Sequence, residues 1–108
     1  KGVTYSIGLY LGEINGPVTM YIPAGKTLVF ASVTADGLEP GQQFALKVSV
    51  KSSTTSEHII FDHNVGAVDE ITYCYNSFSA YRASLTSKAT ILVYVNGKKV
   101  LSQDYDVR

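Results

Sequence analysis

The chain has 108 residues, a length that fits one domain with a core of its own. Hydrophobic residues make up 45% of it and charged residues 17%, which excludes disorder driven by excess charge. Nine basic and nine acidic residues balance to zero formal charge, and the lysines are scattered, so no nucleic-acid partner is expected. We therefore expect a single domain over residues 1–108.

The only cysteine, Cys74, excludes a disulfide within the chain. No apolar run approaches the roughly 18 residues of a membrane span, which predicts no membrane insertion. The N-terminus lacks the charged-then-apolar pattern of a signal peptide. These features predict a soluble chain and leave open whether it is secreted or cytoplasmic.

Residues 1–14 permit two interpretations. The odd-numbered residues from Val3 to Leu11 are all apolar or aromatic, as in a strand, whereas Val3, Ile7 and Leu11 also share one face of a helix. Two glycines disfavour the helix, so a strand is preferred and the helix stays open. Because both patterns leave Val3, Ile7 and Leu11 on an apolar face, we expect a homodimer whose contact includes these three residues.

Strand patterns dominate the rest of the chain. Apolar residues occupy every second position at 18–22, 44–51 and 91–95, which is typical of half-buried strands. The alternation directs Val18, Met20 and Ile22 inward and leaves Tyr21 and Tyr94 on outer faces. Further strands are expected at residues 28–33, 58–63, 71–78 and 100–107.

Turn residues separate these segments at short intervals, and Asn96-Gly97 between two apolar runs is the strongest hairpin signal. Short strands with regular turns predict an all-β fold. We expect an antiparallel β-sandwich of the immunoglobulin or fibronectin-III type with about seven to eight strands.

A metal site can be considered around His58, Asp62 and His63, with Asp69 and Glu70 nearby. Along a strand His63 shares a face with Phe61 while Asp62 points the other way, so the ligands would not converge. A calcium loop of Asp62, Asn64 and Asp69 lacks the required spacing. We therefore expect no metal and no cofactor.

Catalytic motifs are missing from the sequence: it has no nucleophile elbow, phosphate loop or His-Glu-X-X-His pattern. Cys74, between Tyr73 and Tyr75 in an expected strand, is most simply a packing residue. No catalytic residue is predicted, and the chain is not expected to be an enzyme.

Eight tyrosines occur without a tryptophan. Outward aromatic rings can stack on sugar rings or anchor a protein partner. Tyrosine also has high strand propensity, which explains many of the eight without any function. Tyr21 and Tyr94 are the candidate ligand-binding residues.

Three segments taken together resemble the fungal immunomodulatory proteins, which are small, cysteine-poor and lectin-like. The matching segments are residues 3–14 (VTYSIGLYLGEI), 33–50 (VTADGLEPGQQFALKVSV) and 75–81 (YNSFSAY) followed by 91–95 (ILVYV). The resemblance implies a fibronectin-III-like sandwich, a homodimer formed through the N-terminal segment, and binding to cell-surface glycans or glycoproteins. The family's tryptophan-bearing loop is replaced here by residues 15–25, which contain neither Trp nor Arg.

Two functions follow as hypotheses. The first is a lectin-like immunomodulatory protein that acts on cell-surface glycans as a homodimer. The alternative is an immunoglobulin-like structural or adhesion module of a bacterial surface protein or phage virion.

Overall fold

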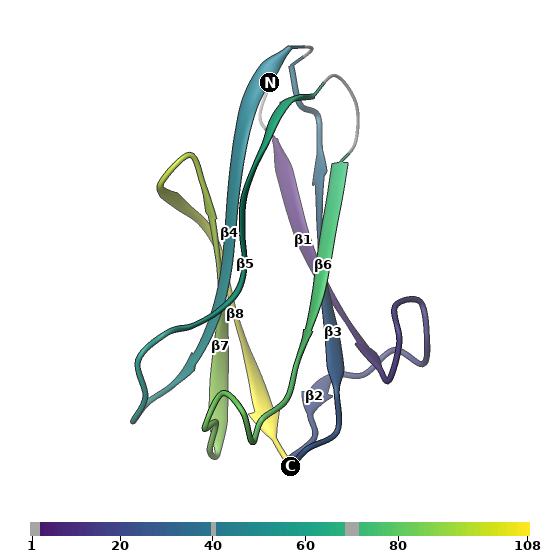
Figure 1. Ribbon diagram of the computed structural model, residues 1–108, viewed down its shortest axis with the longest axis vertical. Coiled ribbons are helices and arrows are strands. Elements are labelled where there is room, and N and C mark those ends of the chain that lie inside the picture. Colours follow the sequence, from purple (N-terminus) through teal and green to yellow (C-terminus); the bar gives the residue numbers. More distant parts are fainter. Residues whose placement is uncertain (1–2, 40, 69–71) are drawn as a thin grey trace.

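The computed structural model describes residues 3–39, 41–68 and 72–108, and strands dominate this part of the chain (Figure 1). The prediction of an all-β fold is confirmed, and no helix long and apolar enough to cross a membrane occurs in these ranges. The strands are β1 (Thr4–Leu11), β2 (Tyr21–Ile22), β3 (Val29–Asp36), β4 (Gln42–Ser52), β5 (His58–Val68), β6 (Thr72–Phe78), β7 (Lys88–Val95) and β8 (Lys98–Val107).

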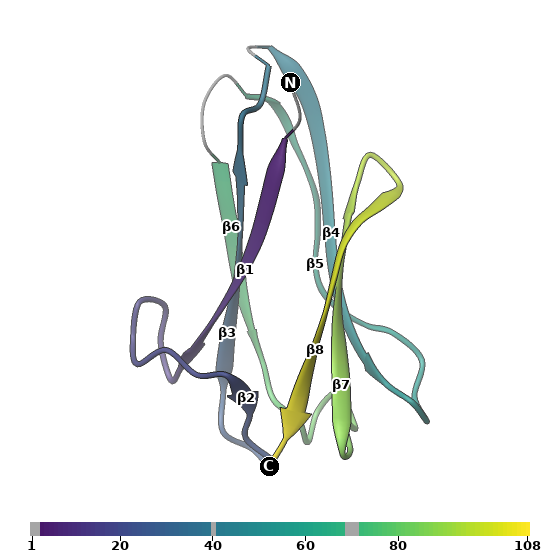
Figure 2. The same cartoon turned by 180° about the vertical axis from the view of Figure 1, so that it is seen from behind.

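The strands form two sheets that face each other across the core. One has the order β1-β3-β6 and the other the order β2-β8-β7-β4-β5. Neighbouring strands are antiparallel except for the short β2, which runs parallel to the end of β8 (Figure 2). The molecule measures 40 × 28 × 21 Å, and β1 begins at one end of the long axis while β8 finishes at the other (Figure 1).

Alternate residues of the central strands fill the space between the sheets. From β4, Phe44, Leu46, Val48 and Val50 are all at most 3% exposed, as the alternation predicts. Ile91, Val93 and Val95 of β7 are buried in the same core, which confirms their predicted orientation. Burying each such side chain stabilises the fold by about 1.5–3 kcal/mol.

The N-terminal segment is a strand, which settles the choice between strand and helix for residues 4–11. β1 pairs with β3 over its whole length, and Ile7 lies opposite Val33. Val3, Ile7 and Leu11 are half-buried and pack against the core of their own chain. The fold therefore covers part of this apolar face within one chain, and the homodimer stays a prediction.

The predicted orientation of residues 18–22 is wrong at Val18 and Met20. These two side chains are 70% and 76% exposed, whereas Thr19 is buried. The Thr19 hydroxyl donates to the carbonyl of Tyr21 at 2.9 Å and accepts from its N–H at 3.2 Å. This local bonding bends the chain, so regular pairing is limited to Tyr21 and Ile22.

The predicted hairpin at Asn96-Gly97 is confirmed. Both residues have positive φ, 53° and 82°, as a two-residue hairpin turn of this kind requires. The Asn96 side chain also accepts from the N–H of Ala45 at 3.0 Å and donates to the carbonyl of Gln43 at 3.3 Å. The turn is therefore anchored to β4 as well as to its own strands.

We expect Ile7→Asp to lower the free energy of unfolding by about 2–4 kcal/mol, because the substitution places a charge against the core. Urea unfolding measures this, and Ser6→Asp on the exposed face of the same strand is the matched control. Light scattering on both variants separates folding from association. A stable Ile7→Asp monomer beside a wild-type dimer would contradict the packing described here and favour the predicted dimer contact.

Candidate functional site

The five-stranded sheet has an outer face that turns away from the three-stranded sheet. The β4–β5 connection and the β7–β8 turn both project on this side and frame the face between them (Figure 1). Residues that alternate with the core positions of β4 and β7 form its centre. They are Lys47, Ser49 and Lys51 of β4, and Thr90, Leu92 and Tyr94 of β7, which lie opposite one another in register.

Glu57, from the segment that joins β4 to β5, lies over this outer face. Its carboxylate accepts hydrogen bonds from the Ser49 hydroxyl at 2.6 Å and from the Tyr94 hydroxyl at 3.1 Å. Ser49 is fully buried and Leu92, directly opposite, is 5% exposed, although both belong to the outer face. The segment that carries Glu57 thus folds back and links two strands of the sheet.

The bonding environment of Glu57 favours its charged form. The hydrogen bond from Ser49 is the main cause that lowers the pKa of Glu57; Tyr94, Lys47 and Lys51 contribute less, and partial burial opposes them. The pKa of the Tyr94 hydroxyl is raised, first by desolvation and then by the neighbouring Glu57 carboxylate. At neutral pH the pair is therefore a carboxylate that accepts from a protonated tyrosine.

Tyr94 borders a hollow of about 240 Å³ at the end of the face nearer the β7–β8 turn. Lys47 and Asp62 line the same hollow, and they face each other in register on β4 and β5. The Lys47 ammonium lies 4.7 Å from the centroid of the Tyr94 ring, within the range of a cation–π contact. An aromatic ring, a cation and one acidic residue therefore meet at this hollow, and the Glu57 carboxylate bonds to the hydroxyl of the same ring.

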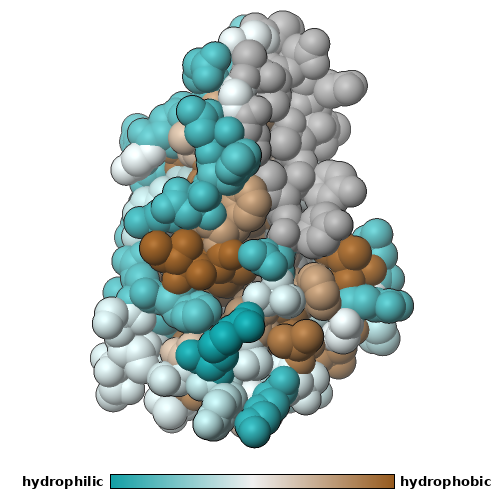
Figure 3. All heavy atoms as spheres, viewed as in Figure 1, coloured by the Kyte–Doolittle hydropathy of each residue, from teal (hydrophilic) through white to brown (hydrophobic). Residues whose placement is uncertain are grey.

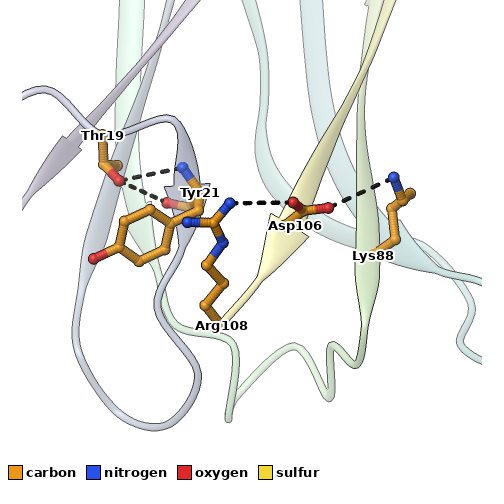
Figure 4. Close-up of polar contacts among 5 residues, drawn as sticks. All are labelled: Thr19, Tyr21, Lys88, Asp106 and Arg108. Carbon is orange, nitrogen blue, oxygen red and sulfur yellow. Dashed lines mark hydrogen bonds and ion pairs between the residues drawn. The ribbon is translucent and has the colours of Figure 1, made fainter.

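Tyr21, the other predicted ligand-binding residue, lies apart from Tyr94. In register, Tyr21 is opposite Asp106 and Tyr94 is opposite Lys99, seven residues away along β8, or about 23 Å. The Arg108 guanidinium stacks on the Tyr21 ring at 5.2 Å and also contacts Asp106 (Figure 4). The two tyrosines do not form one site of small-molecule size.

The residues that were considered as metal ligands do not assemble in the described part of the chain. The His63 ring contacts the Phe61 ring, with centroids 6.0 Å apart, while Asp62 lies opposite Lys47. No group of three possible ligands occurs in the ranges that the structure covers. Asp69 and Glu70, which were considered with them, and the side chain of Cys74 lie outside the described positions.

Apolar groups also reach the surface near this face. Ile59 of β5 is 52% exposed and lies opposite Ser49 in register. Figure 3 shows apolar side chains in brown over this part of β5, and others over the β1–β2 connection, where Val18 is exposed. The outer face therefore offers apolar contact beside its charged groups.

Comparison with family models and with curated proteins found no match. Among solved structures, the Pseudomonas fluorescens alkylpurine DNA glycosylase AlkC, bound to DNA containing an abasic site analog, has a similar fold. The TM-score is 0.62 at 15% sequence identity, and the match covers 96% of this chain and 30% of that chain. The chain therefore spans less than a third of that protein, and the likeness is one of fold.

Ser49→Ala is expected to raise the pKa of Glu57 toward its ordinary value, because it removes the main bond that favours the carboxylate. A carboxyl-detected NMR titration measures the pKa, with Ser102→Ala on β8 as control. The pKa of Glu57 is lower in the folded chain than in the unfolded chain. The bonds to its carboxylate therefore stabilise the fold fully at any pH above the pKa of the unfolded chain. That contribution is lost as the pH falls through the folded pKa. An unchanged Glu57 pKa in Ser49→Ala would refute this account.

Proposed function

We propose that the chain is a non-catalytic, lectin-like immunomodulatory domain that binds cell-surface glycans at the outer face around Tyr94, and that it acts as a homodimer. The observation that carries the proposal is the grouping of the Tyr94 ring, the Lys47 ammonium and Asp62 around one hollow, with Glu57 bonded to the Tyr94 hydroxyl. Sugars need a flat apolar surface for their C–H groups and charged or polar partners for their hydroxyls.

The half-buried Tyr94 ring supplies the flat surface. Its orientation is fixed by the bond to Glu57, so little freedom is lost when a ligand stacks on it. The Lys47 ammonium that lies over the ring would move toward Asp62, its neighbour across β4 and β5. The carboxylate oxygens of Asp62 then accept hydrogen bonds from sugar hydroxyls, while Glu57 holds the Tyr94 ring in place.

The strand order supports the finer fold assignment in this proposal, an immunoglobulin or fibronectin-III-like sandwich. β1, β3 and β6 would correspond to strands A, B and E of that fold, and β4, β7 and β8 to strands C, F and G. The resemblance of residues 3–14, 33–50, 75–81 and 91–95 to fungal immunomodulatory proteins supports the same assignment.

A DNA partner is less consistent with the chain, although the glycosylase of similar fold is described with DNA. Binding to phosphates depends on an excess of basic side chains, and here nine basic residues are balanced by nine acidic ones. Salt-dependent retention on a DNA column would contradict this part of the proposal.

The second candidate is a structural or adhesion module within a longer protein. Two observations favour it: β1 begins and β8 finishes at opposite ends of the long axis (Figure 1), and the similar fold is part of a much longer chain. Such a module would position neighbouring domains and need not bind a glycan.

A glycan array and a red-cell agglutination assay test the first candidate. We expect sugar-inhibitable agglutination by the wild type, and a loss of affinity of about tenfold or more in Tyr94→Ala. Tyr94→Phe keeps the ring and is the matched control, and Tyr21→Ala tests the distant tyrosine. Stability should change by no more than about 1 kcal/mol, as is usual for exposed strand positions. No glycan binding by a folded wild type would favour the structural module.

A further inference from the structure

The outer face carries a second hollow at the end away from Tyr94. It has a volume of about 280 Å³ and lies between β4, the β4–β5 connection and the start of β7. Two lysines and several hydroxyl groups line it, including Lys51, Ser53, Thr55, Ser87, Lys88 and Thr90. None of the residues that line this hollow carries a carboxylate.

We propose that this hollow binds the anionic group, a carboxylate or a sulfate, of an acidic sugar. The inference rests on the proposed glycan-binding function and adds a substrate class to it. Ammonium groups and hydroxyls together satisfy the oxygens of such an anion, because charge-assisted hydrogen bonds are the stronger kind. Lysine suits this role because its ammonium carries three donors on a flexible stem.

The hydroxyl groups differ in how far they are already engaged. Thr55 bonds to Ser52, and Thr90 donates to Asp104 at 2.7 Å. The hydroxyls of Ser53 and Ser87 make no hydrogen bond to any other residue in the described ranges. Two donors that line the hollow thus remain free for a ligand.

The backbone conformation at Ser87 fixes this residue at the edge of the hollow. Its φ is +57°, in the left-handed region that a residue with a Cβ seldom adopts. The carbonyl of Ser87 accepts from the N–H of Val107 at 2.9 Å, which ties this turn to the end of β8. The hydroxyl is therefore carried on a fixed turn.

The two lysines are available to an incoming anion. Lys88 contacts Asp106 at 3.5 Å, but Asp106 has a second cation, Arg108, at 3.4 Å (Figure 4). These groups are at least half exposed, so the pair contributes little and Arg108 can retain Asp106 when Lys88 turns to a ligand. Lys51 makes no ion pair with any described residue, although its charge acts on Glu57 from a distance, and it lies opposite Thr90 in register.

The position of the hollow relative to Tyr94 connects it to the proposed glycan site. Thr90 and Tyr94 are four residues apart on β7, or about 13 Å, and both point to the outer face. Glu57 lies between them, and its carboxylate is occupied by Ser49 and Tyr94. A short acidic oligosaccharide would therefore place a ring on Tyr94 and its anionic group between Lys51 and Lys88.

An NMR titration of backbone amides tests the proposal with three probes at constant ionic strength: glucuronic acid, glucose and inorganic sulfate. Glucuronic acid should give saturable shifts at residues 51–55 and 87–90, and glucose should not. Lys51→Gln and Lys88→Gln should each weaken glucuronic acid binding about tenfold. Lys98→Gln, an exposed strand lysine near the β7–β8 turn, should leave it unchanged.

Three results would overturn the inference. The first is a set of glucuronic acid shifts that do not saturate, and the second is an equal loss of glucuronic acid affinity in Lys98→Gln and Lys51→Gln. The third is sulfate binding as tight as glucuronic acid binding, which would indicate a site for a free inorganic anion.

Tyr94→Ala separates the two proposals. If glycan binding needs Tyr94 but the amides of residues 51–55 show no shift, only the anionic subsite is refuted. If the amides of residues 51–55 shift but no glycan binding depends on Tyr94, only the proposed function is refuted.

Discussion

Burial of alternate side chains from β4 and β7 against the three-stranded sheet determines the remaining geometry of the molecule. Phe44, Val50 and Val93 are each at most 1% exposed in this core. Because successive residues of a strand point to opposite sides, this burial also fixes Lys47, Ser49 and Tyr94 on the outer face. A shift of the strand register by one residue would turn the core side chains outward and the side chains of the candidate site inward. The same apolar pattern therefore specifies both.

The sequence was sufficient for features that depend on local periodicity. The alternation at 44–51 and 91–95 correctly predicted which residues are inward, and Asn96-Gly97 correctly predicted a hairpin. The same alternation predicted the wrong orientation for Val18 and Met20, where the Thr19 hydroxyl bonds to the local backbone and bends the chain. Alternation describes a straight strand, and a side chain that competes for backbone hydrogen bonds ends the straight segment.

The candidate site was only half predictable for a related reason. Tyr94 followed from its strand, but Glu57 is 37 residues away in sequence and reaches Tyr94 only because the β4–β5 connection folds back. Nothing in residues 52–57 except a run of hydroxyl side chains indicated this path. The nearest usable signal was Ser49, a small polar residue between Val48 and Val50, whose burial needs a hydrogen-bond partner.

The opposite positions of the β1 start and the β8 end also determine how the fold responds to mechanical load. A force that pulls these two points apart acts along the strands, which lie close to the long axis (Figure 1). The hydrogen bonds between β1 and β3, and between β8 and β7, would then be sheared together rather than opened one after another. Resistance to tension is therefore shared over two ladders of eight residue pairs each, without any covalent cross-link.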